Sequence, residues 1–243
     1  KITEETIMFD QTGQILLRAG RLGEATREER ELVIIGGVVD VGGAAGLVAS
    51  GVNFRPVWRP TGVATALYSA GNDNLLATAT PLVDWTDIDE VMTYQAENQR
   101  DDRAIAAEQL PIMWRPRIIL TAQKLAGTAA RILSAMEQRS VSGAQTLITG
   151  NPLTTMVPGI KSLFSPYLDF LAALAGSQYA DSDDWFIGDP ARQFIWQEIL
   201  PLQTLRAILQ EEEFHRDIVA AFKGRYYGGI AARDRCGGIV KVN

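Results

Sequence analysis

The chain has 243 residues and a formal net charge of −6, and 47% of its residues are apolar while 21% are charged. This composition excludes a disordered chain and suits one large domain or two small ones, while the acidic balance excludes a basic domain that reads nucleic-acid sequence. A single cysteine, Cys236, excludes an internal disulfide and a cysteine-rich zinc site, and it favours assembly in a reducing compartment.

Residues 1–41 are predicted to form an N-terminal arm and a first helix. Residues 1–20 are interpreted as an extended arm with an apolar patch. Thr26 and Glu29 have capping-box spacing, so a helix is expected to begin at Thr26 and to end near Gly36. Because the chain starts with Lys rather than Met, we expect that it has lost its start.

Residues 32–52 are apolar and long enough for a membrane span. They carry Asp40 at their centre, however, and a carboxylate costs about 3 kcal/mol in the middle of a bilayer. A helix end followed by a buried, glycine-rich turn region is therefore favoured. The glycines do not have the spacing of a dinucleotide-binding or phosphate-binding loop.

A long β-hairpin with very little charge is predicted next. The segments Gly62–Ala70 and Leu75–Val83 favour strands, and Gly71–Asn74 between them is a turn-forming tetrapeptide. Because a two-stranded hairpin is only marginally stable alone, it should lie against the rest of the chain or a neighbouring subunit.

An acid-rich sequence opens the following helix, which is predicted to run from Thr86, its N-cap, to about Asn98. Its expected buried face consists of Ile88, Val91, Met92 and Ala96. Further along, Ile118–Leu120 is predicted to be a short strand, and Thr121 the N-cap of another helix. The apolar residues of that helix recur at helical spacing: Leu125, Ala129, Ile132, Leu133 and Met136. A loop is expected to follow through Gly150–Pro152.

Residues 160–175 carry two conflicting signals. Ile160–Phe164 favours a strand, whereas Ser165 and Pro166, followed by an apolar run, favour a capped helix. The residues alone leave both interpretations open.

The last part of the chain consists of two segments of opposite net charge. Residues 181–215 have a net charge of −6, and residues 216–243 have a net charge of +4. Within the basic part, Ile218–Phe222 and Ile239–Val242 are predicted to be strands.

No local motif identifies an enzyme. Glu212 and His215, the only histidine, have the spacing of two metal ligands on one helix face, but the second such pair of a di-iron site is missing. His215 also lacks the surroundings of a catalytic triad. Asp181, Asp183 and Asp184 offer oxygen ligands for Ca²⁺ without the EF-hand spacing, so a solvated acidic loop is favoured. Core packing is expected for the five tryptophans, Trp58, Trp85, Trp114, Trp185 and Trp196. We therefore predict no catalytic, cofactor-binding or metal-binding residues.

The order of the predicted elements is more informative than any single motif. It runs from an arm and a helix through a low-charge hairpin and an acid-capped helix to a strand–helix unit and two closing strands. Particular segments carry this order: Asp10–Gln14, Leu82–Asp89, Arg117–Leu120 with Leu125–Leu133, Asn151–Leu153 with Ser165–Leu168, Asp184–Asp189 and Phe214–Asp234. Over nearly the whole chain it resembles the major capsid protein of tailed bacteriophages, which has the Hong Kong 97-type coat fold.

The resemblance implies an α+β fold with four parts. These are an N-terminal arm and first helix (1–41), an extended β-hairpin loop across a neighbouring subunit (42–83), a peripheral domain (84–116 with 214–243) and an axial domain (117–213). The long spine helix of the peripheral domain would be the helix over 86–98. The resemblance also favours a strand through Ile160–Leu168, against the capped helix.

The function that the resemblance implies is self-assembly into the icosahedral head shell around the double-stranded DNA of a tailed phage, with no enzymatic activity and no cofactor. The chain would assemble in the host cytoplasm and reside in the virion. Its partners would be its own copies in pentamers and hexamers, and a portal, scaffold, maturation protease or cementing protein. It would contact DNA only non-specifically, and no membrane.

Two alternatives stay open. One is an encapsulin-like cellular nanocompartment shell of the same fold. The other, of a different class, is an α+β enzyme with an acidic cleft at 181–213.

Overall fold

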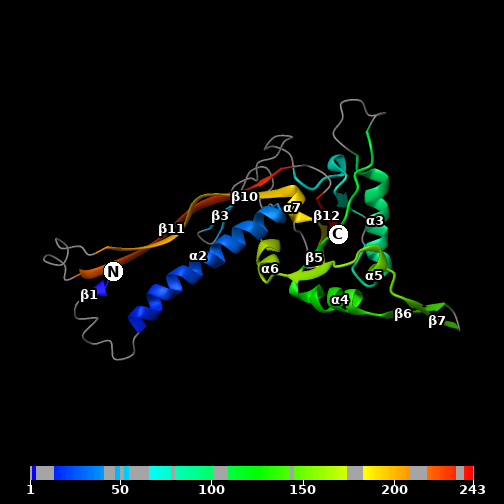
Figure 1. Ribbon diagram of the computed structural model, residues 1–243, viewed down its shortest axis with the longest axis horizontal. Coiled ribbons are helices and arrows are strands. Elements are labelled where there is room, and N and C mark those ends of the chain that lie inside the picture. The colour runs from blue at the N-terminus through cyan, green and yellow to red at the C-terminus, as the bar shows by residue number, and fades with distance from the viewer. Residues whose placement is uncertain are drawn as a thin grey trace. The chain divides into compact units, whose positions relative to one another are not determined.

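The chain folds into two compact units of mixed α and β structure, which agrees with the predicted α+β class (Figure 1). The computed structural model describes residues 2–3, 14–40, 47–49, 52–54, 66–77, 80–100, 109–142, 145–173, 183–207, 218–233 and 238–242. Unit 1 comprises residues 1–34 and 196–229, and unit 2 comprises residues 35–195 and 230–243.

Unit 1 combines a long helix with a three-stranded sheet. Its elements are α2 (Gln14–Val38, which ends in unit 2), β1 (Ile2–Thr3), β10 (Phe194–Ala207) and β11 (Ile218–Ala232). The strand order is β1-β11-β10, and β1 is antiparallel to β11. The helix lies beside the two long strands (Figure 1), where the Arg30 guanidinium stacks 4.9 Å from the ring centroid of Trp196 and pairs with Glu198 at 3.4 Å.

The predicted start of the first helix is wrong. The helix begins at Gln14, so residues 14–20 are not an extended arm. Thr26 lies inside it, where its hydroxyl donates to the carbonyl oxygen of Leu22 at 2.8 Å instead of capping the helix. Helices in proteins take most of their stability from packing, and α2 packs on the strands of unit 1, which offsets the weak helix propensity of its glycines. Residues 4–13 of the predicted arm lie outside the described residues.

Unit 2 is built on a mixed five-stranded sheet. Its strands are β4 (Leu75–Leu76), β12 (Ile239–Val242), β9 (Trp185–Gly188), β5 (Ile118–Thr121) and β8 (Lys161–Phe164), in that spatial order. The β12–β4 and β5–β8 pairs are parallel, whereas β12–β9 and β5–β9 are antiparallel. Every residue of β9 and β12 is buried, as expected of central strands that are covered on both faces.

Several helices accompany this sheet. They are η1 (Ala70–Asn72), α3 (Trp85–Asn98), α4 (Gln123–Ser134), α5 (Leu153–Met156), α6 (Tyr167–Ala172) and α7 (Pro190–Gln193). The core forms where α3, through Ile88 and Val91, and α4, through Ala129 and Ile132, meet the sheet. Gly188 ends β9 with a φ of +154°, and a Cβ there would lie 2.1 Å from the carbonyl oxygen of Gly238, so only glycine fits this position.

Two hairpins in unit 2 lie outside the hairpin predicted at 62–83. One pairs β6 (Glu137–Ser142) with β7 (Gln145–Gly150), and the other pairs β2 (Leu47–Ala49) with β3 (Val52–Phe54). The β6–β7 hairpin is inserted in the crossover from β5 through α4 to the parallel strand β8, and it extends away from the end of α4 (Figure 1).

The long low-charge hairpin predicted at 62–83 is wrong in the described residues. Residues 66–70 contain no strand before η1, and β4 pairs with β12 instead of folding back on its neighbour. This segment is part of the core of unit 2: Leu67, Leu76 and Leu82 are buried, and the Asn74 amide donates to the carbonyl oxygen of Leu67 at 2.8 Å. The low charge therefore reflects burial within the same chain. Residues 61–65, 78 and 79 lie outside the described residues.

The predicted helix caps are also corrected. Asp84, not Thr86, is the N-cap of α3, because its carboxylate accepts the Thr86 N–H at 2.7 Å and Asp87 completes the capping box. Thr121 belongs to β5 and Ala122 precedes α4. Met136 lies beyond the end of α4 and is exposed, so it does not continue the apolar face of that helix.

Other predictions are confirmed. The strand at Ile118–Leu120, the strand at Ile239–Val242 and the end of α3 at Asn98 are observed as expected. The strand signal and the helix signal in residues 160–175 are both correct, each for its own segment, because β8 ends at Phe164 and α6 starts at Tyr167. The strand that the resemblance favoured through Leu168 is wrong, since the Ser165 hydroxyl accepts the Tyr167 N–H at the start of this helix.

The unit boundaries do not coincide with the four predicted parts. Strand β12, predicted to be peripheral, shares a sheet with β5 and β9, which were predicted to be axial. Helix α3, the predicted spine, packs in the same core. The role of each part in a shell stays a prediction.

Candidate assembly surfaces

Two of the acidic residues considered as cation ligands, Asp183 and Asp184, form ion pairs. The Lys124 ammonium lies 2.5 Å from a carboxylate oxygen of Asp183, and that of Lys241 lies 3.1 Å from one of Asp184. The second pair joins the acidic and basic segments within one chain. Asp181, Glu212 and His215 lie outside the described residues, and within the described ranges no group of three or more His, Cys, Asp or Glu side chains could hold a metal.

The tryptophans of unit 2 pack in its core, as predicted. Trp185 is fully buried and its indole N–H donates to the carbonyl oxygen of Thr80 at 3.1 Å. Trp85 and Trp114 pack against the core cluster, and Trp114 donates to the carbonyl oxygen of Gly238. These rings therefore do not form a platform for a sugar or a base. Trp58 lies outside the described residues.

The contacts of Asp40 explain why a carboxylate occurs in this apolar stretch. It is buried beyond the end of α2 and accepts the N–H of Leu67 at 2.7 Å, while the Tyr68 hydroxyl donates to the carbonyl oxygen of Val38. Burial raises the pKa of the Tyr68 phenol. Asp40 thus joins the end of α2 to the segment at Leu67. None of the helices among the described residues is long and apolar enough to cross a membrane.

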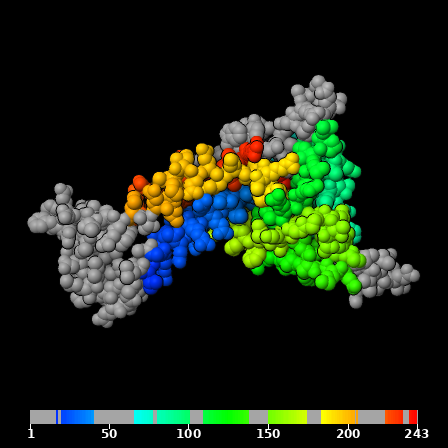
Figure 2. Space-filling view, in the orientation of Figure 1, coloured from blue at the N-terminus to red at the C-terminus, as the bar shows by residue number. Residues whose placement is uncertain are grey.

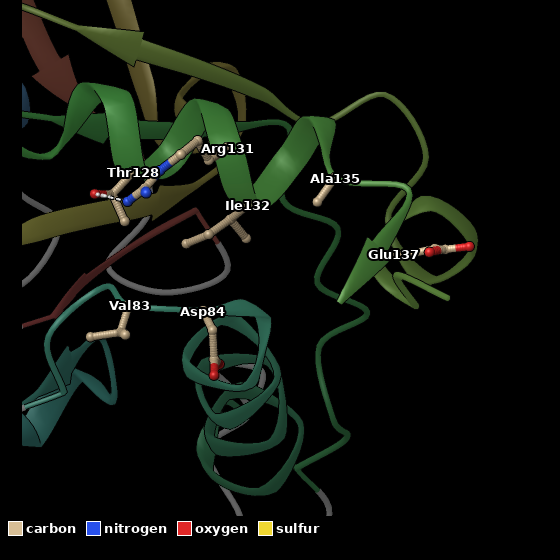
Figure 3. A pocket seen from close by; sticks show the side chains of 7 residues that line it. All are labelled: Val83, Asp84, Thr128, Arg131, Ile132, Ala135 and Glu137. Carbon is tan, nitrogen blue, oxygen red and sulfur yellow. Dashed lines mark hydrogen bonds between the residues drawn. The ribbon is translucent and has the colours of Figure 1, made fainter. Parts of the chain in front are cut away.

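A pocket of about 250 Å³ lies between the start of α3 and the end of α4 (Figure 3). Its lining residues are Val83, Asp84, Thr128, Arg131, Ile132, Ala135 and Glu137. The Arg131 guanidinium donates to the Thr128 hydroxyl at 3.2 Å, and Asp84 is engaged as the cap of α3. No histidine, cysteine, serine or lysine lines the pocket, and its Thr128 hydroxyl and Asp84 carboxylate are engaged in these two contacts.

An open sheet face in unit 1 is a stronger candidate for a functional surface. Trp196 and Glu198 on β10 contact Arg30 of α2, so the alternate residues Ile199 and Leu205 are on the opposite face of the strand. Ile199 is 64% exposed and Leu205 is also exposed. Figure 2 shows atoms of β10, in yellow, at the surface of the molecule.

Strand β11 adds basic and aromatic groups to the same surface. Lys223, Arg225 and Tyr227 are exposed at alternate positions, and the Arg225 guanidinium donates to the Gln203 side-chain oxygen across the two strands. We call the exposed residues Ile199, Leu205, Lys223, Arg225 and Tyr227 the open face of unit 1. Exposed apolar residues rimmed by polar ones mark surfaces that bind other proteins.

Unit 2 also exposes large apolar side chains in its described part. They are Val83, Leu110, Met113, Met136, Met156, Leu163, Phe164, Phe170 and, at the boundary with unit 1, Ile195. These residues and the open face were not predicted from the sequence, because the acidic residues are the main feature of 181–213. The usable signal was the β-favouring run Phe194–Leu200, whose aromatic and β-branched residues are typical of strands.

Comparison with known proteins agrees with a structural role. The family described as phage capsid protein matches residues 1–242, which is nearly the whole chain. No curated protein matches it. The geometry and the comparison lead to one conclusion: this chain belongs to the phage capsid protein family, and it is a structural protein of the virion shell.

Proposed function

We propose that this capsid protein self-assembles into a closed icosahedral head shell that encloses the double-stranded DNA of a tailed phage. The observation that carries the proposal is the open face of unit 1, where Ile199 and Tyr227 are 64% and 59% exposed. Identical subunits that each bury such a face on a different surface of a neighbour make heterologous contacts, which form rings when the rotation between neighbours closes.

The two units suggest separate roles in the shell. The longest described helix is α2 with 25 residues, compared with 14 in α3. We therefore assign the spine of a peripheral domain to α2 and the long strands of unit 1, in place of the helix over 86–98 that was predicted for this role. Unit 2, which contains most of the predicted axial residues, would meet its copies around the five-fold and six-fold axes. The β2–β3 hairpin within 42–83 supports an extended loop at that point of the chain.

The net charge fits a container for DNA. At −6 per chain, repetition of the subunit over the shell gives an acidic surface, which disfavours tight adhesion of the packaged duplex. Assembly would take place in the host cytoplasm, with a portal, a scaffold or maturation protease and a cementing protein as candidate partners. A shell held by burial of apolar faces needs no cofactor and no enzymatic activity.

Electron microscopy of the purified protein tests this proposal. We expect closed particles from the wild type and from the conservative Ile199→Val variant, and folded but unassembled subunits from Ile199→Asp. A wild-type protein that stays monomeric at every concentration would contradict self-assembly. In particles from infected cells, DNA should resist nuclease until the shell is opened, and particles filled with protein cargo instead would support the nanocompartment alternative.

A further inference from the structure

We infer that the β6–β7 hairpin of one copy adds to the open edge of strand β8 in a neighbouring copy, so that the five-stranded sheet of unit 2 continues between subunits. The inference rests on the proposed self-assembly and specifies one of its contacts.

Strand β8 is an edge strand with free hydrogen-bonding positions. It stands last in the sheet order and pairs only with β5 among the described strands. The Lys161 N–H donates to the carbonyl oxygen of Arg117 and the Ser165 N–H to that of Thr121. Because donors toward one neighbour recur every second residue in a parallel ladder, the backbone N–H groups of Ser162 and Phe164 point away from β5.

The edge is also uncovered and apolar. Leu163 is 46% exposed and Phe164 is 59% exposed, although successive residues of a strand point to opposite faces. Both faces of the strand are thus accessible near this edge. Soluble proteins usually protect an edge with charged side chains, especially lysine, with a proline or with a bulge; β8 has one such residue, Lys161 at its start, and none in Ser162–Phe164. An exposed apolar edge of this kind fits an extended strand from a protein partner.

The hairpin supplies such a strand. Its six backbone pairs run from Glu137 with Gly150 to Ser142 with Gln145, so each of its strands is roughly 20 Å long at 3.4 Å per residue. It forms a two-stranded sheet of its own, which leaves the outer edges of β6 and β7 without a strand partner in the described part of the chain. Two-stranded sheets are marginal alone, whereas a larger sheet is stable.

A second copy is the occupant that these features favour. The hairpin begins with the anion Glu137 and β8 begins with the cation Lys161, and neither forms an ion pair with another described residue. The hairpin and the β8 edge are different surfaces of unit 2, so their pairing is heterologous and can propagate from copy to copy around a ring. Main-chain hydrogen bonds would fix the direction of this contact, while Leu163 and Phe164 would lose their exposure.

A proline substitution in β8 tests the outer edge of the strand without removing its hydrogen bonds to β5. In Ser162→Pro the outward N–H is removed while the bonds from Lys161 and Ser165 to β5 remain, and edge strands tolerate proline at such a position. We expect folded subunits, judged by circular dichroism and thermal unfolding, with at least a tenfold loss of closed particles in micrographs. The control Ser162→Val keeps the N–H and should assemble. Normal particle yield from Ser162→Pro would overturn the inference and leave the proposed function intact.

Cross-linking identifies the occupant even if the proline variant does not fold. Two proteins are mixed before assembly, both with Cys236→Ser, one with Ser162→Cys and the other with Ser140→Cys in β6. A short bismaleimide should then give a covalent dimer that neither protein gives alone. Particles that form from the mixture and contain no such dimer would overturn the pairing. If the wild type forms no particles, the shell function fails, and the same cross-link in concentrated unassembled protein still decides the pairing.

Discussion

The buried ion pair between Lys241 and Asp184 gives a sharp test of how unit 2 is held together. Lys241 is in the central strand β12, and the ammonium and carboxylate lie 3.1 Å apart with side chains only 6% and 7% exposed. The perturbation is Lys241→Met, which keeps the length of the side chain and removes its charge. The Asp184 carboxylate then stays in a site from which water is largely excluded.

The expected loss in the free energy of unfolding is large compared with the total stability of a domain. Removing one partner of a buried pair costs about 3–5 kcal/mol, because the remaining charge loses its counterion in a desolvated site. Domains are stable by about 5–15 kcal/mol in total, so Lys241→Met should remove a major fraction of the free energy of unfolding of unit 2. Adding Asp184→Leu removes the remaining carboxylate as well, and the double variant should recover about 2 kcal/mol or more relative to Lys241→Met.

Urea unfolding of unassembled subunits measures these differences, with fluorescence of Trp185 as the probe because β9 pairs directly with β12. The matched control is Lys223→Met, an exposed lysine outside this core, which should change the free energy of unfolding by less than about 0.5 kcal/mol. A loss below about 1 kcal/mol for Lys241→Met, or strict additivity in the double variant, would refute the reasoning.

Three further predictions follow from single contacts. Gly188→Ala places a Cβ 2.1 Å from the carbonyl oxygen of Gly238, so it should prevent soluble expression or sharply lower the melting temperature. The control Gly127→Ala has nothing within 4 Å of the new Cβ and should raise the free energy of unfolding by up to about 1 kcal/mol. Asp84→Ala should cost about 1 kcal/mol in urea unfolding and Thr86→Ala less, because Asp84 is the cap of α3; the reverse order would show that the cap is misassigned. Burial raises the pKa of Tyr68 above its unfolded value of 10.0, so its stabilising contribution is complete below pH 10 and is lost as the pH rises further. Unfolding measured from pH 9 to 11.5 should therefore be steeper in the wild type than in Tyr68→Phe, by up to about 1.4 kcal/mol per pH unit, and equal slopes would contradict the burial of this phenol.

Much of the local structure could be predicted because its signals are local. Ile118–Thr121 and Ile239–Val242 are short runs of apolar residues, which suit strands buried on both faces. The helix after Asp84 was recognised by its apolar spacing even though its cap was misplaced by two residues. At Ser165 and Pro166 the helix signal was correct and the fold-family resemblance was wrong, because the start of a helix is specified within one turn of chain, as in the bond from the Tyr167 N–H to the Ser165 hydroxyl.

The candidate surfaces could not be predicted in the same way. Exposure of Ile199 or Phe164 is not a property of a strand sequence, since an apolar residue looks the same whether its own chain or another subunit covers it. The sequence also could not show that β8 is an edge strand, because strand order depends on pairings between segments far apart in the chain.

The sequence by itself determined an acidic α+β protein without a ligand motif, and its order of elements indicated the capsid family. Only the tertiary structure decided that Leu67, Leu76 and Leu82 belong to the core of unit 2 and that Asp184 pairs with Lys241 across 57 positions of chain. The physical reason is that a segment of low charge needs to be buried and a buried charge needs a counterion. Which other segment meets these requirements depends on how the whole chain packs.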